Sequence, residues 1–303
     1  MKDLRRYKSV KRWFSQVFSS GIRSVTTEKN YLIVLRQFCE YAKKTPDQLI
    51  LERREHLKSD DELVRRQHEE LLTDWINYLE EKRKLARGSV VTMSNTIRSF
   101  YKANYVELQM KSPKLWRTRE RKVPTQEELR LMVENARGIR DKAVIMFLAQ
   151  TGVSLGDFLD LVTYGRIKNE FERGVEPLHL PMERTKIKKK YDTFLGSDGV
   201  EFLREYLRDR RLRSNHPIFD ISRRTVEYIV ASASRRAGLK PTVTPHKLRS
   251  FFSTRLKLAG CPEAQVEYWM GHVVPYRGAY FVPPVEEQRK IYKKFEWSLS
   301  IEG

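Results

Sequence analysis

A basic stretch that contains two prolines, residues 111–124, divides the sequence into two segments with separate helical patterns. This stretch, KSPKLWRTRERKVP, has no helical spacing of apolar residues and is typical of an extended linker. Immediately after it, Thr125 and Glu128 form a capping box that predicts the start of a new helix. We therefore predict a boundary here, between a helical domain at 25–110 and a second domain at 125–303.

The first segment is predicted to form a small bundle of about four helices. Apolar residues at Tyr31, Leu35, Phe38 and Ala42 predict one helix, and similar spacings predict helices over 69–84 and 89–105. Residues 1–24 are basic with a few aromatic side chains. They fit either an amphipathic helix or an arm that becomes ordered on binding, and the sequence leaves both open.

The second segment is predicted to be mainly helical with one small antiparallel sheet. Its two strands are expected at 177–181 and 190–195, with residues 184–189 as the turn that joins them. The predicted helices are 125–136, 139–150, 155–161, 199–210, 222–237, 246–258, 261–270 and 284–295. The expected fold class is therefore mainly α, in two domains.

The net charge of +20 indicates a polyanionic partner. Up to and including Arg121 there are 27 basic and 16 acidic residues, and after it 32 and 23, so both segments are basic. A strongly charged solvated surface is the alternative. The two cysteines have no metal-ligand spacing, and no apolar run reaches membrane-spanning length, so we expect no metal, no membrane and an intracellular protein.

Residues 244–280 combine groups suited to phosphate chemistry. His246 and Arg249 are three residues apart, so they share one face of a predicted helix. Arginine can donate two parallel hydrogen bonds to a phosphate, and histidine can transfer protons near neutral pH. Gly271-His272 follows at a predicted helix end, and Tyr280 comes eight residues later. Taken singly, each fits an ordinary surface, capping or buried role.

The order HxxR, GH and Tyr resembles the carboxyl-terminal signature of the tyrosine recombinases, or phage integrases. TEKNYLIVLRQFCEYA resembles the first helix of that family's core-binding domain, and IRDKAVIMFLAQTGVSLGDFLDL the start of its catalytic domain. The resemblance covers about residues 25–295, and the tail FVPPVEEQRKIY is similar to archaeal members. It implies a site-specific recombinase or integrase with a core-binding domain and a mostly helical catalytic domain.

The resemblance implies that Tyr280 is the nucleophile of a 3′-phosphotyrosine intermediate, formed without metal or ATP. Arg249 and His272 would stabilise the phosphate, and His246 would assist proton transfer. Lys186 would match the family's hairpin lysine, although neighbouring lysines make a register error easy. No cofactor is expected.

One catalytic position departs from the family pattern, which has arginine in TG-x-R where this chain has Ser154. Loss of such a phosphate clamp commonly lowers the rate by about 10³-fold or more. Either another cation replaces it, with Arg140, Arg166 and Arg184 as candidates, or the protein binds DNA with little or no cleavage.

The implied partner is double-stranded DNA at a specific recombination site. The protein would form a homo-tetramer on DNA and be a monomer or dimer when free, in the cytoplasm and associated with the nucleoid. A regulatory DNA-binding protein of the same fold and an RNA-associated protein are the alternatives. The helix 284–295 would dock either on a neighbouring protomer or on its own domain. The expected DNA-binding residues are Arg87, Arg98, Lys102, Arg119, Arg121, Lys122, Lys188 and Lys189.

Overall fold

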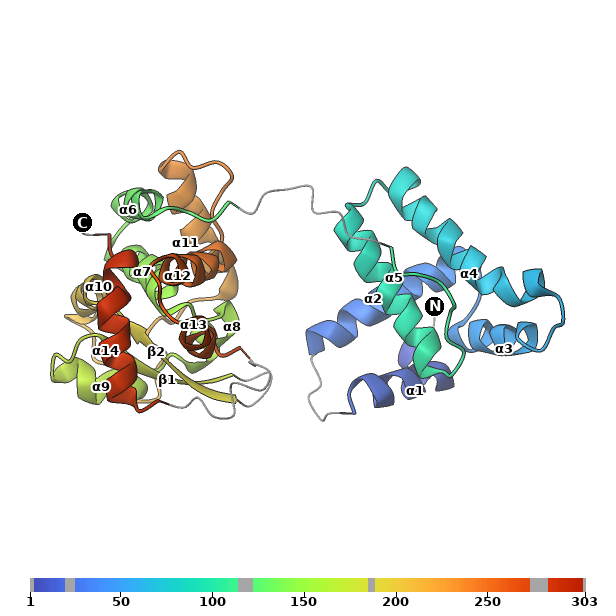
Figure 1. Cartoon of the computed structure of the whole chain (residues 1–303), viewed down its shortest axis with the longest axis horizontal. Coiled ribbons are helices and arrows are strands. Elements are labelled where there is room, and N and C mark those ends of the chain that lie inside the picture. The colour runs from blue at the N-terminus through green and yellow to red at the C-terminus, as the bar shows by residue number, and fades with distance from the viewer. Residues whose placement is uncertain (1–2, 20–24, 114–121, 185–188, 273–282, 302–303) are drawn as a thin grey trace. The chain divides into compact units, whose positions relative to one another are not determined.

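The chain folds into two compact units, Met1–Glu120 and Arg121–Gly303 (Figure 1). The computed structural model describes residues 3–19, 25–113, 122–184, 189–272 and 283–301. Most of these residues are helical, and the sheet among them has two antiparallel strands. The predicted fold class is confirmed, and the boundary between the units falls inside the basic stretch 111–124.

The first unit is a bundle of helices with short connections. Its fourth helix continues into a π-helical turn at Tyr78–Lys82. Helix α3 was not predicted, although Thr45 forms a capping box with Gln48 and Pro46 occupies the first helical turn. The helices are α1 (Lys8–Val17), α2 (Val25–Ala42), α3 (Pro46–His56), α4 (Glu62–Asn77) and α5 (Arg87–Ala103).

Part of the segment 1–24, for which the sequence left two possibilities, is a helix in the core of the first unit. The Trp13 side chain of α1 is fully buried. Its ring stacks on Tyr31 with 4.9 Å between centroids and meets the edge of Phe100 at 5.4 Å. Aromatic packing of this kind stabilises beyond simple burial, so α1 belongs to the bundle in this structure.

The second unit contains nine α-helices, a 3₁₀-helical turn at Glu296–Ser298 and a β-hairpin among its described residues. Each predicted element has a counterpart, and α9 is an addition. The strands extend further toward the turn than predicted, since the pairing of the two strands continues to Arg184 and Lys189. The elements are α6 (Gln126–Glu134), α7 (Ile139–Thr151), α8 (Leu155–Leu161), α9 (Tyr164–Glu172), β1 (Leu178–Arg184), β2 (Lys189–Leu195), α10 (Ser197–Leu207), α11 (Arg223–Arg236), α12 (Pro245–Leu258), α13 (Glu263–Trp269) and α14 (Val285–Phe295).

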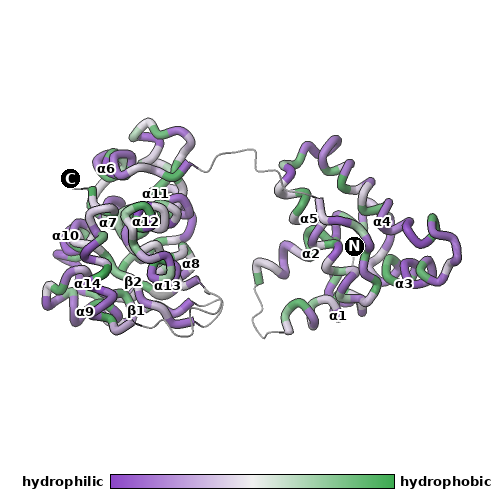
Figure 2. The backbone as a smooth tube through the Cα atoms, viewed as in Figure 1, coloured by the Kyte–Doolittle hydropathy of each residue, from purple (hydrophilic) through white to green (hydrophobic). Residues whose placement is uncertain are grey.

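Helix α7 forms the centre of the second unit. Its residues from Ala143 to Thr151 are all buried, and α10, α12 and β2 pack around it. Hydrophilic and hydrophobic residues are interleaved along most other helices (Figure 2), as expected for helices that bury one face. The buried end of α7 therefore holds the following residues, from Gly152 onward, in a fixed place.

In the described part of the chain, no helix is long and apolar enough to cross a membrane. The same residues contain no group of three or more His, Cys, Asp or Glu side chains arranged as metal ligands.

Candidate active site

A pocket of about 630 Å³ in the second unit brings together several of the residues singled out in the sequence. Its walls come from the α7–α8 connection with the start of α8, the end of β1, α11, the start of α12 and His272, three residues after the end of α13. The lining residues are Val153, Ser154, Leu155, Arg184, Arg223, Glu227, Ala231, Thr244, Pro245, His246, Arg249 and His272.

Arg249 is buried and joins three segments of the second unit. Its guanidinium donates to the carbonyl oxygens of Gly152, after α7, and of Met270, after α13, the latter at 2.7 Å. Its Nη2 atom, which donates to the Met270 carbonyl, also lies 2.8 Å from His272 Nε2. Burial lowers the pKa of Arg249, yet arginine stays charged at any physiological pH. The residue is therefore a cation fixed at the pocket wall.

His272 is oriented by hydrogen bonds at both ring nitrogens. Its Nδ1 lies 2.5 Å from Glu267 Oε2, and its Nε2 faces the Arg249 guanidinium. Because a guanidinium can only donate, Nε2 accepts and the ring proton is on Nδ1. Burial raises the pKa of Glu267, but hydrogen bonds from Lys257 and His272 lower it overall. The ionised carboxylate thus holds the imidazole in one orientation.

Two glycines permit the close packing beneath the pocket. Gly152 and Gly271 have φ of +62° and +65°, which side chains rarely adopt. A Cβ on Gly271 would lie 2.9 Å from the Tyr191 ring, and one on Gly152 would overlap Phe252. The glycine of the GH pair is therefore required by backbone conformation and by packing.

His246 lies in the first turn of α12, where Thr244 caps the helix and Pro245 precedes it. Its side chain is exposed and lines the pocket. Among the described residues, no hydrogen bond or ion pair engages its ring. The predicted face shared by His246 and Arg249 is thus present, with one residue exposed and the other buried.

Ser154 is the N-cap of α8, and its hydroxyl is used inside the protein. Its Oγ accepts from the Asp157 backbone N–H at 3.2 Å and donates to Asp157 Oδ2 at 2.8 Å. The buried Tyr191 hydroxyl donates to the same Oδ2 at 3.2 Å, and burial raises the Tyr191 pKa. Serine at this position stabilises a helix start and contributes no charge to the pocket.

Two cations of the hairpin lie beside His272. Arg184 Nη1 donates to the Gly271 carbonyl at 2.9 Å, and Lys189 Nζ to the His272 carbonyl at 2.5 Å. Burial, and secondarily the nearby Arg184, lower the pKa of Lys189. Of the cations considered as substitutes at position 154, Arg184 lines the pocket, whereas Arg140 pairs with Asp141 and Arg166 donates to the Pro181 carbonyl.

The predicted DNA-binding residues have different surroundings. Arg87, Lys102 and Lys122 are exposed, and each pairs with one glutamate: Glu80, Glu107 and Glu128 respectively. Arg98 is half-buried and donates to the Met110 carbonyl at 2.8 Å, so it holds the chain after α5. Tyr280, Lys186, Lys188, Arg119 and Arg121 lie outside the described residues.

Sequence reasoning missed three residues of the site, Arg223, Glu227 and Glu267. Glu267 has a weak signal, since it is five residues before His272 and three before Met270, near the end of α13. Arg223 and Glu227 are four apart on α11, so they share a helical face. Nothing in their own sequence shows that this face meets α12, because that contact is made only by the fold.

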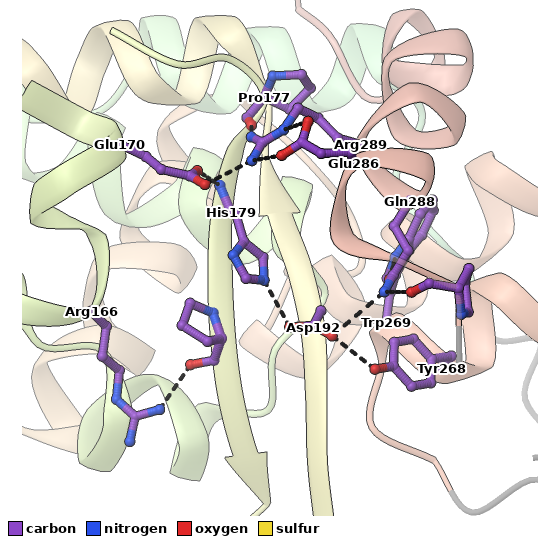
Figure 3. Close-up of polar contacts among 12 residues, drawn as sticks. Arg166, Glu170, Pro177, His179, Asp192, Tyr268, Trp269, Glu286, Gln288 and Arg289 are labelled. Carbon is purple, nitrogen blue, oxygen red and sulfur yellow. Dashed lines mark hydrogen bonds and ion pairs between the residues drawn. The ribbon is translucent and has the colours of Figure 1, made fainter. Parts of the chain in front are cut away.

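A polar network that joins the hairpin to α13 and α14 fixes the helices on either side of residues 273–282 (Figure 3). Asp192 of β2 accepts from Tyr268 of α13 at 2.8 Å and lies 2.7 Å from His179 Nε2. Gln288 of α14 accepts from Trp269 Nε1 at 2.9 Å and donates to the Pro283 carbonyl at 2.9 Å. Burial raises the Asp192 pKa, but hydrogen bonds from His179 and Tyr268 lower it overall.

Comparison with known proteins identifies relatives across most of the chain. A tyrosine recombinase XerC of Leptospira interrogans is 24% identical over 250 residues, which cover 74% of this chain and 76% of the relative. That of Pelotomaculum thermopropionicum is 28% identical over 252 residues (71% and 76%), and that of Staphylococcus epidermidis 25% over 295 residues (86% and 93%).

Solved structures share the fold. A lambda integrase tetramer bound to a Holliday junction has a TM-score of 0.62 and 16% identity, over 91% of this chain and 76% of the other. A lambda integrase dimer bound to a core site has a TM-score of 0.60 and 16% identity, over 91% and 99%. The model of the phage integrase family matches residues 122–275. The chain therefore belongs to the phage integrase family of tyrosine recombinases.

Proposed function

We propose that this protein is a site-specific DNA recombinase that cuts and rejoins DNA through a covalent bond to Tyr280. The observation that carries the proposal is the pocket in which Arg249, His272 and His246 meet, within a family of recombinases. Its partner would be double-stranded DNA, with a homo-tetramer as the active assembly and the nucleoid as its place of action.

The cleavage step is an exchange of one phosphorus–oxygen bond for another. The Tyr280 oxygen attacks the phosphorus, and the bond to the 5′ oxygen of the next nucleotide breaks. The phenol proton passes to a base, with His246 in that role, and the released 5′ oxygen takes a proton from a hairpin lysine, Lys186. A 5′ hydroxyl of the partner strand reverses these steps, so the phosphotyrosine conserves the bond energy and no ATP is consumed.

The charges of the pocket suit the transition state of this step. Negative charge builds on the nonbridging oxygens, and a fixed cation stabilises it without reorganisation. Arg249 has a fixed guanidinium, and Glu267 orients His272 toward the same wall. The hairpin lysines 186 and 188 lie outside the described residues, but Lys189 at the end of the turn is beside His272.

The position of Tyr280 along the chain supports its role. It is three residues before Pro283, whose carbonyl accepts a hydrogen bond from Gln288 of α14. Tyr292 of α14, which is 12 residues after Tyr280, is buried and donates its hydroxyl to the Gln150 carbonyl at 2.8 Å. Burial raises the pKa of Tyr292, so it is unsuited to attack a phosphate.

A second function is favoured by the environment of Ser154. Since its hydroxyl donates to Asp157, Ser154 has no hydrogen left to donate to a phosphate. A protein of this fold that binds DNA but does not cleave it would act as a DNA-binding regulator. The two functions differ in one measurable product, the covalent complex.

The test uses duplex fragments of the DNA that flanks the gene, incubated with the protein and quenched in SDS. Covalent attachment sites are mapped, and a duplex nicked next to the mapped position then traps the intermediate. We expect a covalent complex with the wild-type protein and none with Tyr280→Phe, while both bind the duplex equally. Trapping by Tyr280→Phe would transfer the role to another tyrosine such as Tyr276, and no complex with wild type would favour the regulator.

A further inference from the structure

The pocket has a neutral serine at position 154, where the family pattern TG-x-R has arginine. We propose that Arg223, from a different helix, supplies the missing phosphate contact and acts as a catalytic residue. The inference rests on the proposed cleavage function and assigns the compensating group within that site.

Arg223 reaches the neighbourhood of Ser154. A Cβ placed on Gly156 would lie 3.9 Å from Arg223 Nη2 and 3.8 Å from Ser154 Oγ. Two atoms that are each within 4 Å of one point are less than 8 Å apart, about the length of an extended arginine side chain. Arg223 Nη2 therefore lies within the radius that an arginine side chain at position 154 could span.

The backbone of Arg223 is well placed to hold this position. It is the first residue of α11, and Ser222 caps the helix by accepting from the Thr225 backbone N–H at 3.1 Å. Val226 and Val230 of the same helix are buried in the core. The side chain thus extends into the pocket from a fixed helix start, while its own surface remains exposed.

The guanidinium of Arg223 is also uncommitted. Across the described residues, it takes part in no hydrogen bond or ion pair, although it lines the pocket. Arg184, a half-buried arginine that also lines the pocket, donates to the Gly271 carbonyl beside His272. Arg223 is therefore the arginine that can give its paired N–H groups to a phosphate without breaking an internal contact.

Glu227, one helical turn after Arg223, places a carboxylate at the same wall. No ion pair joins it to Arg223 within 4.0 Å, and its charge opposes a phosphate. Arg223 and Glu227 therefore have opposite effects on a phosphate at this wall. Removing the charge of Arg223 should slow cleavage, and removing the charge of Glu227 should speed it.

The first test compares Arg223→Ala with Arg224→Ala. Both variants remove one exposed positive charge from the start of α11, but Arg224 does not line the pocket. With the nicked duplex, we expect Arg223→Ala to form covalent complex about 10²- to 10³-fold more slowly than wild type. Arg224→Ala should stay within about threefold of wild type, and Arg223→Lys should retain part of the rate.

The second test moves the cation back to the family position. In the Arg223→Ala background, adding Ser154→Arg should raise the rate of covalent-complex formation at least tenfold. In the wild-type background, the same substitution should raise this rate much less. This difference measures a shared role, because independent sites have additive effects. Circular dichroism and binding of the uncut duplex verify that each variant folds.

Equal rates for Arg223→Ala and Arg224→Ala, or an equal gain from Ser154→Arg in both backgrounds, would overturn the assignment of Arg223 alone. A wild-type protein that forms no Tyr280-dependent complex would overturn the proposed cleavage function together with it. The two failures are thus distinguished by the wild-type lane of the same assay.

Discussion

The two sides of the pocket differ in how their charged groups are held. On the Arg249 side, formed by Arg249, His272 and Glu267, each charged or polar group is bound to another part of the second unit. On the Arg223 side, formed by Ser154, Arg223 and Glu227, Ser154 serves a helix start and the other two lie exposed on α11.

Because of this difference, substitutions on the two sides are expected to affect folding stability and cleavage differently. A buried, multiply bonded residue contributes to folding as well as to any reaction, so a substitution affects both. An exposed and unpaired residue contributes little to folding, so the fold tolerates its exchange. The signature positions of the Arg249 side are those that match the family, and the departure falls on the other side.

The largest effect is expected for Arg249→Ala. This change leaves the buried carbonyls of Gly152 and Met270 without their donor and frees His272. We expect a loss of about 3 kcal/mol or more in the free energy of unfolding, and at least about 10³-fold slower cleavage. Urea denaturation measures the first and the nicked duplex the second.

Arg223→Ala is the matched control, with a change in unfolding free energy within about 0.5 kcal/mol. Equal destabilisation by the two arginine variants would contradict the proposed difference between the two sides.

A smaller effect is expected for Gly271→Ala. The positive φ alone costs about 1–2 kcal/mol, and the contact at 2.9 Å with the Tyr191 ring adds to it. Gly174→Ala separates the two causes, because Gly174 has φ of +70° and nothing within 4 Å of a Cβ. Thermal denaturation should therefore show a larger loss for Gly271→Ala, and identical losses would exclude the Tyr191 contact.

Glu267→Gln tests how far orientation of His272 matters. We expect cleavage about 10-fold slower, because the amide can still accept from Nδ1 but lacks the charge. Glu263→Gln is the control, since Glu263 pairs with Lys257 at 2.8 Å without touching His272. Comparable rates for both variants would show that the Glu267 charge has no positioning role.

The same carboxylate predicts a pH dependence. The folded pKa of Glu267 is below its usual value of 4.5. Its stabilising contribution is therefore complete above about pH 4.5 and is lost as pH falls through the folded pKa. Amide protection factors of α13, which correct for the intrinsic pH dependence of exchange, should fall with acidification in this range more in the wild type than in Glu267→Gln. A parallel fall in both proteins would contradict the assignment.

The smallest effect is expected for Glu227→Gln on the Arg223 side. Removing a negative charge that faces the phosphate should raise cleavage about two- to threefold at low salt, with a smaller gain at higher ionic strength. The covalent complex measured at two salt concentrations provides the test. A decrease in rate would indicate that Glu227 positions a group instead of opposing the phosphate.

The sequence by itself determined most of the helices, the two strands and the signature residues, but not helices α3 and α9. Capping at Thr125, the apolar run of α7 and the glycine of the GH pair are local signals, and their physical causes act within a few residues. The serine at position 154 was visible in the same way, as a departure from a motif.

Only the tertiary structure decided which cations and carboxylates meet around that departure. Arg223 is 69 positions beyond Ser154, and Lys189 reaches the carbonyl of a residue 83 positions later. Such contacts arise because α7, α11, α12 and the hairpin pack around one core. Packing depends on the fit of whole faces, which no spacing in the sequence records.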